Sequence, residues 1–263
     1  MILRVENLST VLPTSAGPLR AIRDVTFDVG ENEIVGLVGE SGSGKSVTIN
    51  SVLGLLRHAG ARTTGSARFE AGTDLIALDN RRLRQLRGSR IGFVAQNPFG
   101  ALHPILPVGR QFEYLIRAHR RMARGRIRER ALELLGKVGI RGPERVLDGY
   151  AHELSGGMAQ RTVIAMALAL DPPLIIADEP TTALDLTVQK QILDLIHGLV
   201  RNDRRSMLIV THDLGVVHNY CDRVVVMYRG TVVESGPTRA LFANPAHDYT
   251  RALIEGQMPR GMP

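Results

Sequence analysis

Eight consecutive residues near the start of the chain have the spacing of a phosphate-binding loop. Residues Gly39–Ser46 match the pattern G-x-x-x-x-G-K-[ST]. Glycine lets backbone N–H groups wrap closely around a phosphate, while Lys45 supplies a cation for the β/γ-phosphates and Ser46 a hydroxyl ligand for Mg²⁺. A buried strand is predicted at Ile34–Val38 and a helix at Val47–Leu53. The order strand, loop, helix argues against a Gly/Ser-rich surface turn and predicts a nucleoside triphosphate site.

Four other polar residues lie at the ends of predicted strands. The carboxyl ends of parallel strands face the ligand crevice of a sheet, so these residues are candidates to meet a ligand there. Asp178 and Glu179 end the apolar run Leu174–Ala177. Asp178 is a candidate Mg²⁺ ligand through water, and Glu179 is the candidate general base for an attacking water. His212 and Gln96 follow two other strands and are candidate γ-phosphate sensors. Exposed acids and a structural histidine are the alternative interpretation.

The stretch Leu154–Gln160 offers a second anion site. It places a hydroxyl and several small residues at the start of a predicted helix, whose first amides have no intrahelical partner. One γ-phosphate hardly needs two cradles from one chain. We therefore expect this stretch to serve a nucleotide held mainly by another copy or a paralogue, in a head-to-tail dimer with ATP between the subunits.

Composition favours a globular protein large enough for one domain with an inserted subdomain. The chain has 263 residues, of which 44% are hydrophobic and 22% charged. We expect a cytosolic protein, since no apolar run is long enough for a membrane span and the N-terminus is charged where a signal peptide would be apolar. Cys221 is the only cysteine, which excludes an internal disulfide and a cysteine-ligated cluster and favours a small buried apolar side chain.

The net charge of +7 comes largely from arginine, which is dense in residues 81–90 and 117–130. These arginines alternate with glutamate and apolar residues, which favours a solvated helical surface. An anionic membrane face or nucleic acid remains the alternative.

Hydrophobic patterning predicts strands and helices in an α/β order. Strands are predicted at Ile2–Val5, Val25–Val29, Gly65–Glu70, Ile91–Ala95 and Met207–Val210, and as a hairpin at Val224–Met227 and Val232–Val233. Helices are predicted between Val108 and Gly139, after Leu154, over residues 188–199 and in the tail around 238–242 and 250–254. Loops are predicted around Pro13–Pro18 and over residues 96–104.

Together these motifs resemble, in content and order, the ATPase subunit of an ATP-binding-cassette (ABC) transporter, over nearly the whole chain. Gln96 resembles the Q-loop glutamine, Leu154–Gln160 the signature, Ile175–Glu179 the Walker B strand, Leu184–Asp185 the D-loop and His212 the switch histidine. The resemblance implies catalytic roles for Glu179, His212 and Gln96, and Mg²⁺ ligation by Ser46, Gln96 and Asp178. It implies ATP binding by Gly39, Glu40, Ser41, Gly42, Ser43, Gly44, Lys45, Ser46 and Val47, and contact with a partner's ATP by Ser155, Gly156, Gly157 and Asp185.

The implied fold is an α/β P-loop NTPase core with a mainly parallel sheet, an N-terminal antiparallel β-subdomain and an inserted α-helical subdomain. Residues 1–95 and 171–235 would form the core with the β-subdomain. Residues 96–170 would hold the Q-loop and the helical subdomain with the signature, and 236–263 a C-terminal tail.

The implied partners are a second ABC ATPase subunit, two transmembrane permease subunits and an extracytoplasmic solute-binding protein, with no nucleic acid. We expect the second ATPase subunit to be a paralogue, with an identical copy as the alternative. The chain would be peripheral, at the cytoplasmic face of the membrane, with the permease received by residues 96–125.

Within this family the chain resembles the peptide/nickel importer group, through residues 39–46, 178–185 and 247–253. Two residues depart from its pattern: Asp248 stands where proline is usual, and Leu12 where the family has an aromatic residue that stacks on adenine. The chain also stops soon after the tail motif, which favours a nickel-type or short peptide-type subunit. Peptide, nickel, chelate or opine-like cargo and the direction of transport are left open by the residues themselves.

Two other classes compete. A soluble ABC ATPase acting on nucleic acid or ribosomes is favoured weakly by the positive charge, but the sequence shows no second cassette, long heptad insertion or zinc-type cysteine set. A phosphate-loop kinase or GTPase would have no need for Leu154–Gln160.

Overall fold

The computed structural model describes residues 1–182 and 184–256. Ala183, within the predicted D-loop region, and the last seven residues of the predicted tail lie outside the described residues. The chain forms two compact units, one made of residues 1–83 with the described residues from 206 onwards and the other of residues 84–205. These two units differ from the predicted division into a core, a helical subdomain and a tail. The boundaries of that division stay a prediction.

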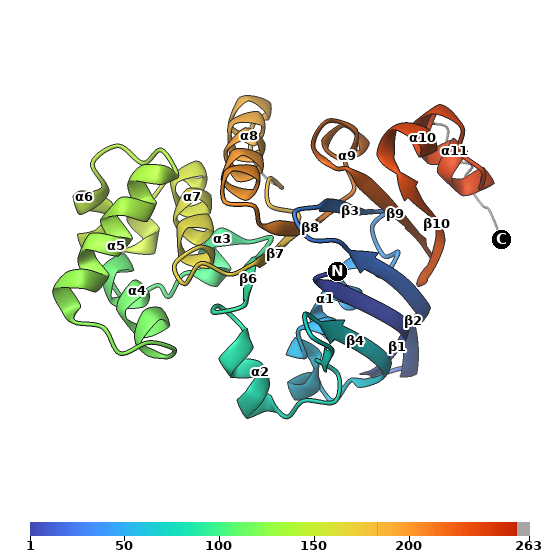
Figure 1. Cartoon of the computed structure of the whole chain (residues 1–263), viewed down its shortest axis with the longest axis horizontal. Helices are drawn as coiled ribbons and strands as arrows, with labels where there is room; N and C mark the ends of the chain where they lie inside the picture. The colour runs from blue at the N-terminus through green and yellow to red at the C-terminus, as the bar shows by residue number, and fades with distance from the viewer. Residues whose placement is uncertain (183, 257–263) are drawn as a thin grey trace. The chain divides into compact units, whose positions relative to one another are not determined.

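An antiparallel sheet forms one part of the first unit (Figure 1). Its strand order is β2-β1-β4-β5, with bounds Gly17–Val29, Leu3–Thr14, Arg62–Phe69 and Thr73–Asp74. The loop predicted around Pro13–Pro18 is mostly wrong, because β1 and β2 continue pairing up to Thr14 and Gly17. Proline is tolerated there since the tip of this hairpin is exposed. The expected antiparallel N-terminal sheet is therefore present, with longer strands.

A second sheet positions the phosphate loop. Its strands in this unit follow the order β10-β9-β3-β8, with bounds Thr231–Pro237, Arg223–Tyr228, Ile34–Val38 and Ser206–Thr211. Strand β3 is parallel to both β8 and β9, and all five of its residues are buried, as a central parallel strand requires. The hairpin β9–β10 is antiparallel, as predicted.

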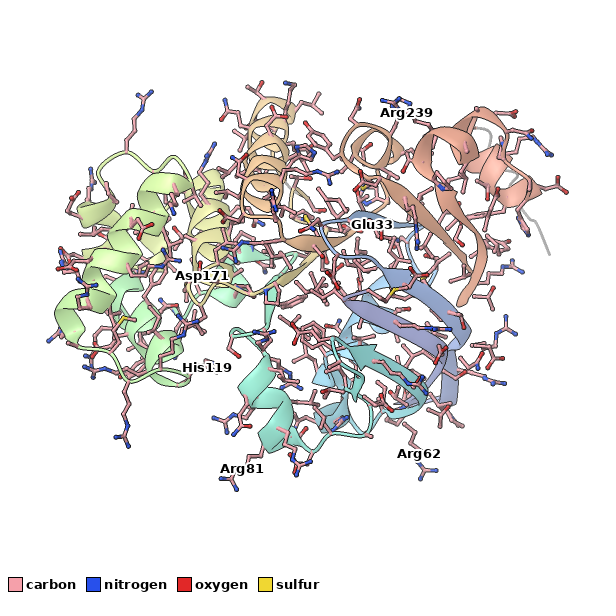
Figure 2. The ribbon with its side chains drawn as sticks, in the orientation of Figure 1. Glu33, Arg62, Arg81, His119, Asp171 and Arg239 are labelled. Atoms are coloured by element: carbon pink, nitrogen blue, oxygen red, sulfur yellow. The ribbon has the colours of Figure 1, made fainter. Side chains whose placement is uncertain are left out.

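Short helices complete this unit, with bounds α1 Lys45–Val52, α9 Leu214–Tyr220, α10 Thr238–Ala243 and α11 Asp248–Ile254, and a 3₁₀ turn at Leu55–Ala59. Helix α1 begins two residues earlier than predicted. Cys221, at the end of α9, is buried, as expected for a small apolar side chain. The side chains of Arg62, Arg81 and Arg239 extend away from the ribbon and are exposed (Figure 2), which fits the solvated-surface interpretation of the positive charge.

The second unit contains two parallel strands and most of the helices. Strands β6 (Ile91–Val94) and β7 (Leu174–Asp178) pair in parallel, with Val94 opposite Ala177. Its helices are α3 Pro98–Ala101, α4 Val108–Arg117, α5 Arg124–Lys137, α6 Pro143–Asp148, α7 Gly156–Ala167 and α8 Leu186–Asn202, with a 3₁₀ turn at Ala151–Glu153, while α2 (Asn80–Leu86) spans the division.

The helical stretch between 108 and 139 is confirmed, as two helices with one buried face on α5. That face consists of Ile127, Ala131, Leu134 and Leu135, at the predicted spacing. The loop predicted over 96–104 contains one turn of helix, α3, because the Asn97 side chain accepts hydrogen bonds from the amides of Phe99 and Gly100 and so caps it.

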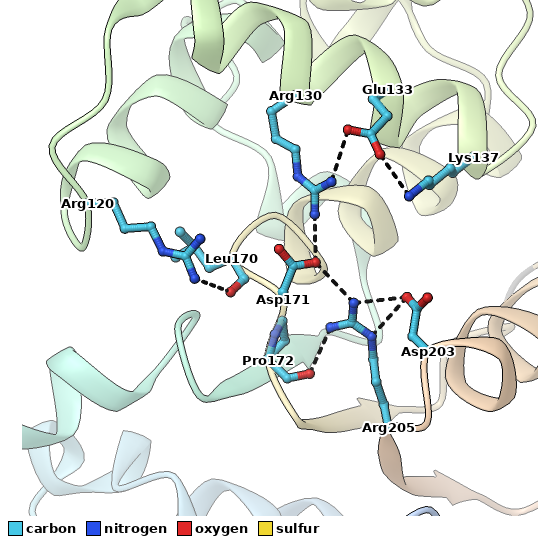
Figure 3. A network of polar contacts seen from close by, with 9 residues as sticks. All are labelled: Arg120, Arg130, Glu133, Lys137, Leu170, Asp171, Pro172, Asp203 and Arg205. Carbon is cyan, nitrogen blue, oxygen red and sulfur yellow. Dashed lines mark hydrogen bonds and ion pairs between the residues drawn. The ribbon is translucent and has the colours of Figure 1, made fainter.

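A polar network supports the segment that leads into β7 (Figure 3). The Asp171 carboxylate accepts from Arg130 on α5 at 2.7 Å and from Arg205 after α8 at 3.1 Å. Arg205 also donates to Asp203 and to the Pro172 carbonyl. These bonds tie the segment directly before β7 to helix α5 and to the segment that follows α8.

Candidate functional site

The loop between β3 and α1 is closed around its own lysine. Lys45 is buried, and its Nζ donates to the carbonyl oxygens of Gly39 at 2.7 Å and Glu40 at 2.8 Å. Helix α1 begins at Lys45 and is capped by Gly44, which has no side chain to occupy the helix N-terminus. The ammonium group and the positive end of the helix therefore lie in the same short loop.

Two glycines of this loop are required by packing, and a third adjoins open space. A Cβ on Gly39 would lie 2.2 Å from the Met227 carbonyl oxygen, and one on Gly44 would lie 2.7 Å from Ile22 Cγ2. Gly42 has a φ of +82°, and apart from Gly42 itself and its two chain neighbours no described residue has an atom within 4 Å of the Cβ it lacks. The loop is therefore fixed on its protein side and accessible at Gly42.

Ser43 carries a buried polar atom that the described part of the chain leaves without a hydrogen-bond partner, its Oγ. Such atoms are uncommon in folded proteins because leaving one unpaired is costly. A hydroxyl, an ammonium group and a helix N-terminus in one glycine-rich loop suit a bound polyphosphate. The loop residues fit a nucleoside triphosphate.

His212 leaves the sheet at the same edge as this loop. It directly follows Thr211, which is paired in parallel register with Val38, the last residue of β3. Its side chain is exposed. The prediction that these two segments share one edge of the sheet is consistent with this register.

In the second unit, Gln96 and Glu179 are in direct contact. Gln96 Nε2 donates to Glu179 Oε2 at 2.9 Å, and Thr182 Oγ1 donates to the same oxygen at 2.8 Å. Asp178, the last residue of β7, is buried. Glu179 has a φ of +44°, a conformation that non-glycine residues adopt at a cost and that commonly marks functional positions. Two side chains therefore orient a carboxylate on a backbone held in an unusual conformation.

Thr182 is a residue that the sequence interpretation missed. It lies within the quoted stretch 178–185, but only its position relative to Glu179 indicates a role. Tyr249, on α11, was quoted only as part of the tail motif, yet its hydroxyl accepts a hydrogen bond from the Glu40 amide of the phosphate loop at 3.0 Å. The Tyr249 contact joins residues 209 positions apart, which local patterns do not encode.

The predicted signature stretch begins a helix, as expected. Ser155 caps α7, its side chain accepting from the Met158 amide at 3.3 Å, and Ser155 is exposed. A Cβ on Gly157 would lie 3.1 Å from Val188 Cγ1, and one on Gly156 would lie 3.5 Å from Leu184 Cδ2. The small residues therefore let the start of α7 approach the start of α8.

Asp185 has a structural function within the chain. Its Oδ1 accepts from the Val188 amide at 3.0 Å and so caps α8. The described residues thus bring Ser155, Gly156 and Gly157 close to the D-loop segment, on an exposed part of the second unit.

Leu12 lies opposite Leu19 near the tip of the β1–β2 hairpin. The only aromatic residue in those two strands, Phe27, is buried in the core. The hairpin therefore offers aliphatic side chains where the family has an aromatic one. Among the residues that the structure describes, no helix has both the length and the apolar character needed to cross a bilayer.

A strand, a lysine-bearing glycine loop and a helix in this order define a phosphate-loop nucleotide triphosphatase. Comparison with known proteins narrows this class. The ABC transporter family model matches residues 22–182. A probable peptide ABC transporter ATP-binding protein of Sinorhizobium fredii is 47% identical over 254 residues, which are 97% of this chain and 76% of that protein. The chain belongs to the ABC transporter family.

Two further similarities bear on function. A peptidoglycan transport ATP-binding protein of Agrobacterium fabrum is 46% identical over 263 residues, and this chain spans 48% of its length. A dimeric ATP-binding cassette in a post-hydrolysis state, bound to ADP and Pi, superposes with a TM-score of 0.79 and 31% identity, covering 90% of this chain and 99% of that one. The predicted fold is confirmed, and the chain is an ATP-binding subunit with ATPase activity.

Proposed function

We propose that this chain is the ATP-hydrolysing subunit of a membrane importer for peptides, acting as one of two cassettes that close around ATP. The proposal rests on one observation, that the chain has two different candidate anion sites, here called corners. The first corner is the complete phosphate loop, and the second is the exposed start of α7, which Ser155 caps. The name of the Sinorhizobium relative supports peptide as cargo. Nickel or a metal chelate is the second candidate, supported by the resemblance of the tail to the peptide/nickel group.

Residues of the phosphate loop would hold the nucleotide in cis. The loop amides and Lys45 would bind the β- and γ-phosphates, and Ser43 Oγ would gain the partner that the described chain leaves it without. The residues assigned to ATP are Gly39, Glu40, Ser41, Gly42, Ser43, Gly44, Lys45, Ser46 and Val47. When bound, Mg²⁺ would neutralise phosphate charge as hydrolysis proceeds. Its oxygen ligands in this assignment are Ser46, Gln96 and Asp178.

Glu179 would act as the general base. Hydrogen bonds from Gln96 and Thr182 both reach its Oε2, and they fix the direction in which the carboxylate can accept a proton from water. A change in the conformation of the segment that carries Gln96 would thus change the orientation of Glu179. His212, exposed after β8, would contact the γ-phosphate and report its loss.

The start of α7 would serve the ATP of the second cassette. Ser155, Gly156 and Gly157 would present a hydroxyl and helix amides to that γ-phosphate, and Asp185 would communicate across the dimer. The dimeric state of the structural neighbour supports this arrangement. We expect the second cassette to be a paralogue, with an identical copy as the alternative.

The complex would contain two transmembrane permease subunits, and the segment 96–125 would receive one of them, which places the chain at the cytoplasmic face of the membrane. Large apolar side chains are exposed here: Phe99 by 44%, Ile105 by 77% and Tyr114 by 54%. Such exposure on one segment marks a candidate protein interface. An extracytoplasmic binding protein would deliver solute to the same complex, and nucleic acid would have no part.

The test is to purify the chain with the membrane proteins that accompany it and measure ATPase activity with candidate solutes. We expect co-purification of permeases and stimulation by a peptide mixture in the presence of the solute-binding protein. Stimulation by Ni²⁺ or its chelate, and not by peptides, would move the cargo to nickel. Purification without membrane partners, together with stimulation by RNA or DNA, would contradict the transporter assignment.

A further inference from the structure

The last described helix reaches back to the phosphate loop. Tyr249 on α11 accepts a hydrogen bond at its hydroxyl from the Glu40 amide, 3.0 Å away and 209 residues earlier in the chain. Tyr249 is only 2% exposed. Its ring lies against that of Tyr228, at the end of β9, with a centroid distance of 4.2 Å. A buried aromatic side chain from the tail is therefore aimed at the backbone of the nucleotide loop.

The bonded amide belongs to the peptide group that joins Gly39 to Glu40. The carbonyl of the same peptide group accepts from Lys45 Nζ at 2.7 Å. Its N–H and its C=O are therefore held from two sides, by Tyr249 and by Lys45. Rotation of this peptide group would break both bonds, and a hydrogen bond at one end of an amide strengthens the one at the other.

The tail itself is anchored, so Tyr249 is held in place. The Glu234 carboxylate on β10 accepts from the amides of Ala246 at 2.9 Å and His247 at 3.0 Å, directly before α11. The neighbouring β9–β10 turn also bonds to the loop, through Gly230 N and the Ser43 carbonyl at 2.9 Å. Figure 1 shows α10 and α11 following β10 at the end of the described chain.

We propose that Tyr249 is a positioning residue for ATP binding, which fixes the Gly39–Glu40 peptide group and thereby the carbonyl that holds Lys45 in the loop. The inference rests on the proposed assignment of residues 39–47 to ATP. It gives the tail a function in the nucleotide site of its own chain. Burial raises the pKa of Tyr249, against a smaller opposing effect of the Glu40 amide, so its hydroxyl stays neutral over the physiological range.

The variant Tyr249→Phe tests this because it removes the hydroxyl and keeps the ring against Tyr228. Loss of one buried acceptor should weaken ATP binding by the full-length protein about fivefold. In the purified transporter, KM for ATP should rise by a similar factor, with kcat at saturating ATP within about twofold of the parent value. The Glu40 amide should exchange with deuterium faster, while amides of α11 keep their protection.

Asp248→Asn is the matched control, on the same helix with a side chain 79% exposed. It should change neither ATP affinity nor exchange at Glu40. Tyr249→Ala removes the ring as well, so a larger loss than in Tyr249→Phe separates packing from the hydrogen bond. Unchanged ATP affinity and unchanged Glu40 exchange in Tyr249→Phe would overturn the inference.

Failure of this inference is distinguishable from failure of the assigned site. If Lys45→Ala leaves ATP binding unchanged, residues 39–47 do not hold ATP, and both statements fail. If Lys45→Ala weakens binding but Tyr249→Phe does not, the nucleotide site stands and only the role of the tail is wrong.

Discussion

Helices α1 and α7 both begin in a stretch of small residues, but different residues cap them. Gly44 caps α1 without a side chain, and the adjacent Lys45 is buried against carbonyls of its own loop. Ser155 caps α7 with its own hydroxyl and is exposed, followed by two glycines. The first corner carries a buried cation and is accessible at Gly42. The second has no lysine beside it, so it can complete a site but is poorly suited to hold a triphosphate alone.

This difference suits the proposed sharing of one ATP between two cassettes. A triphosphate demands a cation and a tight cradle, which the phosphate loop supplies. An exposed helix N-terminus without a neighbouring lysine adds a weaker, directional contact that a second subunit can make or release. In the proposed dimer, the two cassettes can then close and open around ATP without a change in the phosphate loop.

The largest effect is expected from Glu179→Gln, which lies outside both corners and so separates binding from hydrolysis. ATP should still bind, and the closed dimer should accumulate, because the amide cannot accept a proton from water. Hydrolysis should fall by about 10²–10⁴, the usual contribution of a general base. Steady-state phosphate release measures this, with Glu129→Gln on the exposed face of α5 as control. Hydrolysis at the parent rate would remove the role given to Glu179.

The next largest effect is expected at the first corner, the phosphate loop. Lys45→Ala should weaken ATP binding about 10- to 100-fold, because charge-assisted hydrogen bonds to the phosphates are lost. An equilibrium titration with a fluorescent ATP analogue measures it. Lys190→Ala removes an exposed lysine side chain from α8 and should leave affinity unchanged. Equal affinities for the Lys45 variant and the parent would contradict the assignment of the loop.

A smaller effect is expected from removing one hydrogen bond to Glu179, the proposed general base. Thr182→Val removes one of the two hydrogen bonds to Glu179 Oε2 while keeping a side chain of similar shape. We expect kcat to fall about three- to tenfold with little change in KM, since the bond orients the carboxylate and contacts no phosphate. Thr187→Val, on the exposed start of α8, is the control. A rise in KM with constant kcat would indicate a role in binding instead.

The phosphate loop, the strand-end acids and the start of α7 could be predicted because each is a contiguous pattern with a local structural meaning. The hairpin β1–β2 could not be bounded, since Pro13 and Gly17 resemble a loop while cross-strand pairing, a non-local property, continues to the tip. Asn97 likewise begins a helix turn inside a stretch rich in helix breakers.

The contacts around the candidate site could not be predicted because they join residues far apart in the sequence. Gln96 reaches Glu179 across 83 residues, and Tyr249 reaches Glu40 across 209. Composition and periodicity carry no signal for such pairs. A tyrosine within a tail motif indicates at most that the tail is ordered, and only the fold shows which backbone amide it meets.

The most direct test of the two-corner account is Ser155→Arg in the Glu179→Gln background of the purified transporter. With Glu179→Gln alone, we expect labelled ATP to be retained through gel filtration, because the cassettes stay closed around it. Adding Ser155→Arg places bulk and positive charge at the exposed corner, so ATP should still bind at equilibrium but should no longer be retained. Ser235→Arg, at an exposed position of β10, should leave retention intact. Equal retention with and without Ser155→Arg would contradict the account.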